Sequence, residues 1–508
     1  MDKRVKTIKE YYTNLIGYGI NKKEALKKIS DLSLKLKFKD ANDFANRLCE
    51  TASIIQDNFF LFASVCEHED IVTSIIDYLK HFGVQLMYDM YGEFKNKHDV
   101  IVSLMYTIYH VGLESEMELF LENTIVEDSE AHHITQCSDL IFELGDPNIE
   151  MILLEEADLY AVINCLKIEN AFFLSKIWVH ESIKQTFQLH IKKCSEHLSV
   201  PIHIFQSKRD LLTSEILMDS QIRIISIWSE DIVGARNLAM SLKKDVIFIN
   251  TYMTFCAGIV FPYSKIYYNK DRIFQIKDKC TEEENNSKCI INPKRNKSYN
   301  QFRKYYELFY NGTWQKPLEN TYWIHNDILL ANATSEDIKK CMKSAVKGFK
   351  IWSAESINSR MAVLSRLALI LESKGETLLA DTVSKWLKLP YFCINPLTRH
   401  ETEQFEITKV REPKGILILE EKDKVTMFRE LTQSLIFGNS IIVVCNPNLC
   451  TLESYCDMFS CSIMPPGVIN LLSSINLKQV KYDDFSKSNP EDIYLQLTIN
   501  KYIVVCLK

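Results

Sequence analysis

Short apolar runs alternate with helical patterns between residues 149 and 250, and this alternation restricts the fold more than any other feature. The runs "IEMILL" and "KIWVH" are typical of buried strands, and a helical pattern follows each of them. "RIISIWS" and "DVIFIN" repeat the arrangement on either side of the helical segment 231–244. Strands that alternate with helices predict an α/β fold with a largely parallel sheet.

A second pattern of the same kind begins after residue 304. "YELFYNGTWQKP" predicts a hairpin that turns at Asn311 and Gly312, because both residues accept a positive φ. Thr334 and Asp337 resemble the two ends of a capping box, and a further helix is expected to begin near Ser356. "GILILEE", "SIIVVC" and "GVINLL" predict the later strands.

The two patterned regions differ from the segments around them. Residues 268–303 are polar, charged and without periodicity, which is typical of a linker or long loop. Residues 20–100 have a helical pattern, in which Leu48, Ala52 and Ile55 share one face. We therefore expect a first module over 1–267, helical over 1–110 and α/β over 141–267, then a linker over 268–303 and a second module over 304–508.

Composition excludes several classes of protein. The formal net charge of −6 gives no general reason to bind nucleic acid or an anionic membrane. The N-terminus lacks the apolar core of a signal peptide, and no run reaches the ~18 apolar residues that a membrane helix needs. We therefore expect a cytoplasmic protein.

The 15 cysteines are expected to be mostly small buried apolar residues rather than disulfides, because the cytoplasm is reducing. Cys445, Cys450, Cys456 and Cys461 lie close together in the sequence, but no CxxC pair or nearby His completes a zinc site. His132, His133 and Cys137 could hold a metal ion, although a solvated loop is the preferred interpretation. No metal site is predicted.

Several ordered segments resemble the aldehyde dehydrogenase superfamily. Residues 335–380, "SEDIKKCMKSAVKGFKIWSAESINSRMAVLSRLALILESKGETLLA", are similar to its N-terminal helical part. "REPKGILIL", "LTQSLIFGNSIIVV" and "MPPGVINLL" follow in the family's order. In the first half, "FELGDPNIEMILLEEADLYAV" resembles the Glu-Leu-Gly-Gly motif, and "ISIWSEDIVGARNLAMSLKKDVIFINTY" resembles a late catalytic segment. Two shortened modules in tandem point to family 16 of this superfamily, with a Rossmann-like parallel sheet and flanking helices.

The resemblance implies a reaction with four requirements. A Cys thiolate attacks the aldehyde, an Asn side chain and a backbone N–H stabilise the oxyanion, a Glu activates water, and NAD(P) accepts a hydride. Glu143 matches the general base, although Asp146 replaces the second Gly of its motif. Only Leu174 and Ser175 stand where the nucleophile loop is expected. The nearest cysteine, Cys165, belongs to the preceding helix and is expected to be an inert core thiol.

The cofactor motifs are also incomplete. The family's Pro-Trp-Asn segment is replaced by "EEKDKVTMF", and its ribose-binding Lys by Val444 or Asn446, depending on the gap. The Gly-rich turn that holds the pyrophosphate is absent from both modules. No cofactor-binding residue is therefore predicted.

The preferred hypothesis is an inactive pseudoenzyme that acts as a scaffold for other proteins, including itself or a full-length aldehyde dehydrogenase. The alternative is an NAD(P)-dependent oxidoreductase that oxidises aldehydes to carboxylic acids. Two further possibilities are an incomplete gene model, suggested by the missing loops, and a helical-repeat adaptor, suggested by residues 1–110. The family assembles through an extended arm and late strands, both altered here.

Overall fold

The computed structural model describes about three fifths of the chain. The described residues are 41–63, 72–73, 76, 79–80, 83, 148–168, 174–194, 200–213, 223–252, 259, 274–276, 290–291, 304–325, 328–392, 397–401, 405–474, 477–480 and 489–507. The candidates Glu143, His132, His133 and Cys137 lie outside these residues, as does the whole segment "ENAFF".

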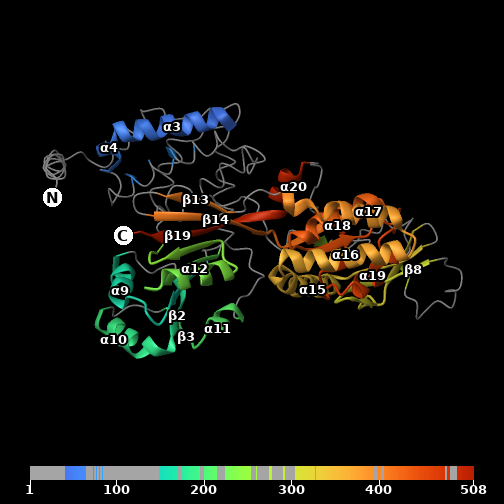
Figure 1. Cartoon of the computed structure of the whole chain (residues 1–508), viewed down its shortest axis with the longest axis horizontal. Coiled ribbons are helices and arrows are strands. Elements are labelled where there is room, and N and C mark those ends of the chain that lie inside the picture. Colours follow the sequence, from blue (N-terminus) through green and yellow to red (C-terminus); the bar gives the residue numbers. More distant parts are fainter. Residues whose placement is uncertain are drawn as a thin grey trace.

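The described chain has a mixed α/β architecture, with parallel strands and flanking helices, as the alternating pattern predicts (Figure 1). An eight-stranded sheet runs in the order β13-β14-β19-β5-β4-β1-β2-β3. Its strands are β1 (Asn148–Leu153), β2 (Leu174–His180), β3 (Ile202–Phe205), β4 (Arg223–Trp228), β5 (Val246–Ile249), β13 (Leu397–Glu401), β14 (Phe405–Pro413) and β19 (Thr498–Cys506). The six neighbours from β19 to β3 pair in parallel, and β13 and β14 are antiparallel additions.

Helices connect the parallel strands of the first half. They are α9 (Leu159–Ile168), α10 (Lys184–Cys194), α11 (Lys208–Thr213) and α12 (Ile232–Ser241), with the short 3₁₀ helix η2 (Glu181–Ile183) before α10. The helical pattern after "IEMILL" corresponds to α9, which begins directly after Asp158 because the Asp158 carboxylate accepts hydrogen bonds from the amides of Tyr160 and Ala161. Residues of α11 and α12 pack on one face of the sheet in a core that also contains Ile503 and Val505 of β19.

Strands from both halves of the chain therefore form one sheet. Figure 1 shows the red and orange strands β19 and β14 beside the green strands of the first half. β19 pairs in parallel with β5, from Tyr502 opposite Val246 to Val505 opposite Ile249.

A five-stranded sheet lies in the second half, in the order β10-β9-β17-β16-β15. Its strands are β9 (Leu308–Tyr310), β10 (Thr313–Gln315), β15 (Ile416–Glu420), β16 (Ser440–Val444) and β17 (Ile469–Leu472). β15, β16 and β17 are parallel. The hairpin of β9 and β10 confirms the prediction, since Asn311 and Gly312 have φ values of 54° and 72°.

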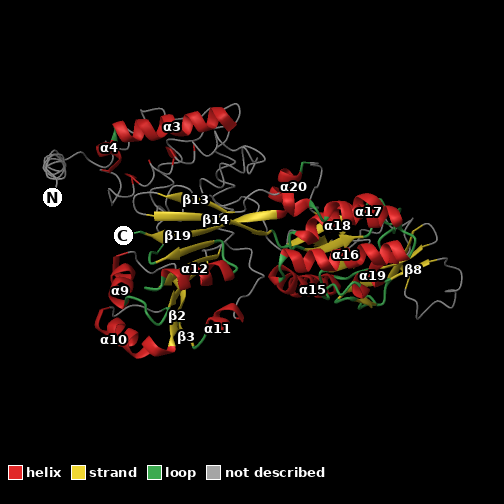
Figure 2. Ribbon diagram, viewed as in Figure 1, coloured by secondary structure: helices red, strands yellow, loops and turns green. Residues whose placement is uncertain are grey.

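Helices cover both faces of this five-stranded sheet (Figure 2). They are α15 (Ser335–Ala354), α16 (Ile357–Ser373), α17 (Thr377–Trp386), α18 (Lys424–Ile436) and α19 (Cys456–Cys461), with the 3₁₀ helices η5 (Leu389–Phe392) and η6 (Glu453–Tyr455) and, before β19, α20 (Pro490–Leu497). Side chains of β16 alternate between the two faces of the sheet and so contribute to two separate cores. Ile441 and Val443 face the side of α18, and Ile442 faces α15. The predicted capping box is present at Thr334 and Asp337, and Ser356 caps α16.

Two smaller sheets complete the described strands. A four-stranded sheet has the order β7-β11-β12-β8, and β18 pairs with β6 in a two-stranded sheet. Their bounds are β6 (Phe274–Ile276), β7 (Ile290–Ile291), β8 (Lys304–Tyr306), β11 (Tyr322–His325), β12 (Ile328–Ala331) and β18 (Leu477–Val480). β6 and β7 thus lie within the segment 268–303.

Helices are also present near the N-terminus, as the pattern predicts. α3 (Ala41–Asp57) is followed by α4 (Phe59–Ala63). Leu48, Ala52 and Ile55 are fully buried, which confirms the apolar face expected for this segment. Within the described helices, none is long and apolar enough to cross a membrane.

Candidate functional site

The positions that align with the family's nucleophile loop are part of a regular strand. Leu174 begins β2 and is buried, and the Ser175 hydroxyl donates a hydrogen bond of 2.6 Å to the carbonyl of Ile149 on β1. The register of β1 and β2 shifts at this point, between Ile149 and Glu150. These two residues therefore join neighbouring strands.

Cys165 lies in α9, as predicted, and is a half-buried free thiol rather than a fully buried one. The only predicted catalytic residue, Glu143, is outside the described residues, so its role as general base stays a prediction. No described group of three His, Cys, Asp or Glu side chains is placed to hold a metal ion.

The sequence analysis did not predict a buried charge cluster centred on Glu150 of β1. The Glu150 carboxylate accepts hydrogen bonds of 2.9 Å from Lys244 Nζ and from Trp178 Nε1, and Lys176 lies 3.4 Å away. Burial alone would raise the pKa of Glu150. The Lys244 ammonium, both hydrogen bonds and Lys176 together lower this pKa by more than burial raises it, so the net pKa is below its ordinary value. This carboxylate is ionised and fully engaged, which suits a structural role.

The carboxyl edge of the eight-stranded sheet is closed by mutual hydrogen bonds. The Ser229 amide donates to Asn250 Oδ1 at 2.9 Å, and Asn250 Nδ2 donates to the Ser229 carbonyl at 2.7 Å. The Ser229 hydroxyl donates to Glu156 at 2.8 Å. These polar groups thus already satisfy one another where β4 and β5 end.

The carboxyl edge of the five-stranded sheet carries the most informative arrangement. Glu421 follows β15 directly, and its residue is only 1% exposed. Its carboxylate accepts backbone hydrogen bonds from Asn446 at 2.9 Å, Thr451 at 2.7 Å and Leu452 at 2.7 Å, and one from the Thr451 hydroxyl at 3.2 Å. We call this group of three backbone donors around Glu421 the amide cradle. Such convergent N–H groups are a favourable environment for an anion.

The four-stranded sheet packs against this same edge. Tyr306, Trp323 and Leu330 form a buried cluster with Cys450, and Cys445 is packed against that cluster. Burial, together with the nearby Glu453 carboxylate and the thiols, raises the pKa of Tyr306 to about 12. His325 Nε2 also lies 2.7 Å from Asn448 Oδ1 in the loop after β16. The edge is therefore covered by side chains of β8, β11 and β12.

Val444 or Asn446 aligns with the family's ribose-binding Lys, depending on the gap. Val444 is apolar, and the Asn446 amide is hydrogen-bonded to Glu421. Val444 is buried at the end of β16, and Asn446 provides one of the amides of the cradle. The sequence could have indicated the role of Glu421, since an acidic residue directly after a buried parallel strand lies at the edge where ligands bind.

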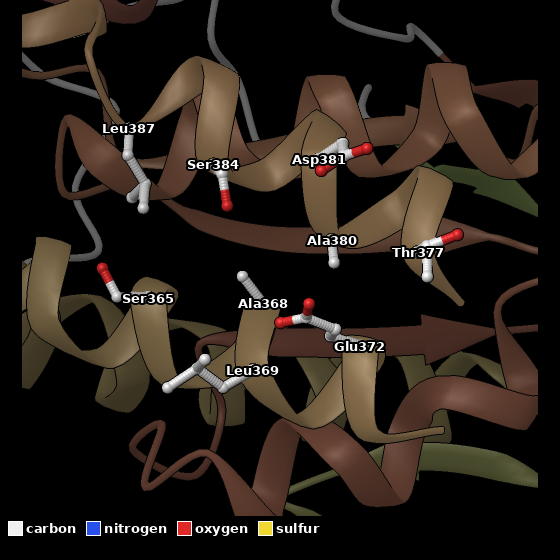
Figure 3. A pocket seen from close by; sticks show the side chains of 9 residues that line it. All are labelled: Ser365, Ala368, Leu369, Glu372, Thr377, Ala380, Asp381, Ser384 and Leu387. Carbon is white, nitrogen blue, oxygen red and sulfur yellow. The ribbon is translucent and has the colours of Figure 1, made fainter. Parts of the chain in front are cut away.

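A groove of about 270 Å³ lies between α16 and α17, and its lining residues belong to these helices or directly follow α17. Figure 3 shows that side chains from both helices face the gap. Ala368, Ala380 and Leu387 make its buried floor, and its rim contains Ser365, Leu369, Glu372, Thr377, Asp381 and Ser384. No described residue forms an ion pair with Glu372 or Asp381. The groove combines an apolar floor with two accessible carboxylates.

Comparison with known proteins agrees with the predicted superfamily. No protein-family model matches the chain. The chain is similar to the aldehyde dehydrogenase tropH of Talaromyces stipitatus, with 24% identity over 205 aligned residues. That match covers 33% of this chain and 39% of the relative, so the chain spans well under two thirds of the relative's length.

Three of the similar solved structures are also dehydrogenases. They are a 3,6-anhydro-L-galactose dehydrogenase in complex with NAP (15% identity, TM-score 0.30, 34% of this chain and 42% of that one), the aldehyde dehydrogenase KauB of Pseudomonas aeruginosa (16%, 0.30, 33% and 41%), and a 1-pyrroline-5-carboxylate dehydrogenase from Thermus with bound NAD (15%, 0.29, 35% and 40%). On the sequence match, the chain is related to the aldehyde dehydrogenase superfamily, as its motifs predict. Two tandem modules remain a prediction.

Proposed function

We propose that this chain is a catalytically inactive aldehyde dehydrogenase-like protein that binds other proteins. The observation that carries the proposal is the Glu421 carboxylate within the amide cradle. Ligands of open α/β sheets bind at the carboxyl edge of the strands, and phosphates prefer clustered backbone N–H donors there. Because Glu421 already supplies a negative charge to these donors, a dinucleotide phosphate would have to displace a buried carboxylate.

Two further features oppose NAD(P) at this edge. Val444 cannot donate a hydrogen bond to a ribose, and the buried cluster of Tyr306, Trp323 and Leu330 occupies space beside Cys450. The residues present therefore do not fit the cofactor that the family uses. We expect no dinucleotide to bind, and we derive no step through one.

The first half of the chain supports the same proposal, because the residues that align with the family's nucleophile are unsuited to that role. Leu174 and Ser175 are strand residues, and Ser175 donates its hydroxyl proton to a backbone carbonyl. Cys165 lies within the helix α9, outside the loop where the resemblance places the nucleophile. This position favours an inert residue.

The groove between α16 and α17 is the surface that we assign to protein binding. A Lys or Arg side chain could lay its methylene groups on Ala368 and Ala380 and its charge between Glu372 and Asp381. We therefore expect a partner segment that presents one basic residue beside an apolar one.

Thermal unfolding with NAD or NADP tests the loss of the cofactor site. A ligand at ~100 times its dissociation constant stabilises the folded state by about 2.7 kcal/mol, which is readily measured. We expect no change in the unfolding midpoint with millimolar dinucleotide and no aldehyde-dependent reduction of NAD(P). A clear stabilisation, or turnover that is lost in a Cys165→Ala variant, would instead support the alternative of a working oxidoreductase.

A charge reversal in the groove tests the binding surface separately. We expect the double variant Glu372→Lys, Asp381→Lys to lose affinity for a purified partner that the wild-type chain binds. Glu319→Lys is the matched control, because Glu319 is exposed in the loop between β10 and β11, outside the groove. Equal binding by the wild type and both variants would exclude this groove as the docking surface.

A further inference from the structure

Two thiols meet at the carboxyl end of β16, beside the amide cradle. Cys445 Sγ and Cys450 Sγ are 3.6 Å apart, and both are free cysteines. A disulfide needs a sulfur–sulfur distance of about 2.05 Å, so the two sulfurs must approach by only about 1.5 Å. The chain already brings these side chains into van der Waals contact.

The segment between the two thiols lies at the surface and can absorb such a movement. Asn448 and Leu449 are exposed, and Cys450 adopts an uncommon positive φ of 43°. The Cys450 amide donates to the Asn446 carbonyl at 3.0 Å, which holds this short loop in a tight turn. A small change in this turn would move Cys450 without disturbing β16.

Each of the two thiols directly precedes a residue that is hydrogen-bonded to Glu421, so a disulfide would affect the amide cradle. Cys445 directly precedes Asn446, and Cys450 directly precedes Thr451, and both following residues donate their amides to the Glu421 carboxylate. A bond between the sulfurs would therefore join the two chain segments whose amides form the amide cradle.

We propose that Cys445 and Cys450 form a reversible disulfide that locks the amide cradle around Glu421. Each thiol loses one hydrogen atom, a sulfur–sulfur bond forms, and hydrogen peroxide accepts the two electrons and two protons, so that its oxygen–oxygen bond breaks and two water molecules are released. A dithiol reductant reverses the step. The inference concerns regulation of this edge, and it does not depend on whether the chain binds a protein partner.

The environment of the pair determines how fast the step occurs. The hydrogen bond between the thiols, burial and the Glu421 carboxylate all raise the pKa of Cys445. The thiolate is the reactive form, so the disulfide is expected to form slowly. Its stability once formed follows from proximity, because the folded chain holds the two sulfurs together.

Other cysteines in this region serve as internal controls. Cys456 is buried and its thiol donates to the Leu452 carbonyl at 3.6 Å, whereas Cys461 is exposed on α19. If oxidation followed exposure alone, Cys461 would react first. If oxidation instead depends on the short distance between the two sulfurs, Cys445 and Cys450 lose their reactivity toward alkylation together.

The experiment is oxidation of the folded full-length chain with hydrogen peroxide, followed by unfolding in guanidinium with N-ethylmaleimide. Peptide mass spectrometry before and after reduction then locates the protected thiols. We expect Cys445 and Cys450 to become protected from alkylation together, with a peptide mass lower by two hydrogen atoms, and to be recovered with dithiothreitol.

Variants distinguish this disulfide from random oxidation. Cys450→Ser should leave Cys445 open to alkylation, whereas Cys456→Ser should leave the disulfide unchanged. Circular dichroism checks that each variant folds, and Cys445→Ser provides a second route if Cys450→Ser does not. The proposal is overturned if both thiols remain alkylable after exhaustive oxidation, or if Cys445 pairs equally with Cys456 or Cys461.

Discussion

The Lys501 ammonium group donates a hydrogen bond of 2.9 Å to the Glu412 carboxylate, and Lys501 itself is only 1% exposed. The same nitrogen also donates to the carbonyls of Met240 and Leu242, at 3.2 and 2.5 Å. Lys501 lies on β19, Glu412 on β14, and the carbonyls at the end of α12. One buried side chain thus connects the late strands to the first half of the chain.

We therefore expect Lys501→Met to destabilise the chain by about 3 kcal/mol, because it leaves Glu412 and two carbonyls without their donor. Urea denaturation measures the change in the free energy of unfolding. Lys339→Met is the matched control: Lys339 is 69% exposed and pairs with Glu336 at 3.8 Å on the helix surface, where such a pair contributes about 0.5 kcal/mol or less. Equal losses in the two variants would contradict the importance of the buried cation.

The Glu150 cluster predicts a dependence of stability on acid. The pKa of Glu150 is lowered from its ordinary value of 4.5, so the folded state binds its proton less readily than the unfolded state does. Its stabilising contribution is complete above the unfolded pKa and is lost as the pH falls through the lower folded pKa. We expect the free energy of unfolding of the wild type to fall more steeply below about pH 4.5 than that of Glu150→Gln. Parallel curves would show that Glu150 does not titrate in this way.

The amide cradle predicts that a smaller side chain creates an anion site. In Glu421→Ala, the three backbone donors lose their acceptor, and we expect a loss of about 2–4 kcal/mol in stability. Inorganic phosphate should then stabilise the variant in thermal unfolding, whereas the wild type should not respond. Glu420→Ala, at the neighbouring exposed position, is the control. A phosphate response in the wild type as large as in Glu421→Ala would contradict our account of this edge.

The close contact between α15 and the turn before β17 requires glycine at position 348. A Cβ on Gly348 would lie 2.2 Å from the backbone carbon of Gly467, which cannot move without shifting β17. We expect Gly348→Ala to cost about 3 kcal/mol, near the upper end for overpacking. Gly375→Ala, at a position with open space but a φ of 82°, should cost about 1 kcal/mol in comparison. Guanidinium denaturation of both variants would check the order.

Local patterns predicted the elements that local interactions determine. The hairpin at Asn311 and Gly312 follows from their tolerance of positive φ, and the start of α15 follows from the reciprocal bonds of Thr334 and Asp337. The strands β1, β2 and β16 lie where their apolar runs are. The helix after β1 begins at Leu159, where the Asp158 carboxylate caps it.

The pairing of β19 with β5 could not be predicted in the same way. Tyr502 lies opposite Val246, at a separation of 502 − 246 = 256 residues, and nothing in either segment specifies its distant neighbour. The hydrogen-bond partners of Glu421 were equally hidden, because its three backbone donors belong to the segment after β16. Sequence patterns report burial and propensity, whereas such roles depend on residues that only the folded chain brings together.

The position of β19 also has a consequence for how the chain folds during synthesis. β5 is complete at Ile249, but its neighbour in the sheet ends at Cys506. At ~5–20 residues per second, a ribosome needs roughly 12–50 s to make the intervening segment. During that interval the apolar edge of β5 is an unpaired template for other strands, and chaperone binding would be most valuable there. Ribosome pausing after β5 has emerged, and before β19 has been made, would therefore be expected to increase aggregation.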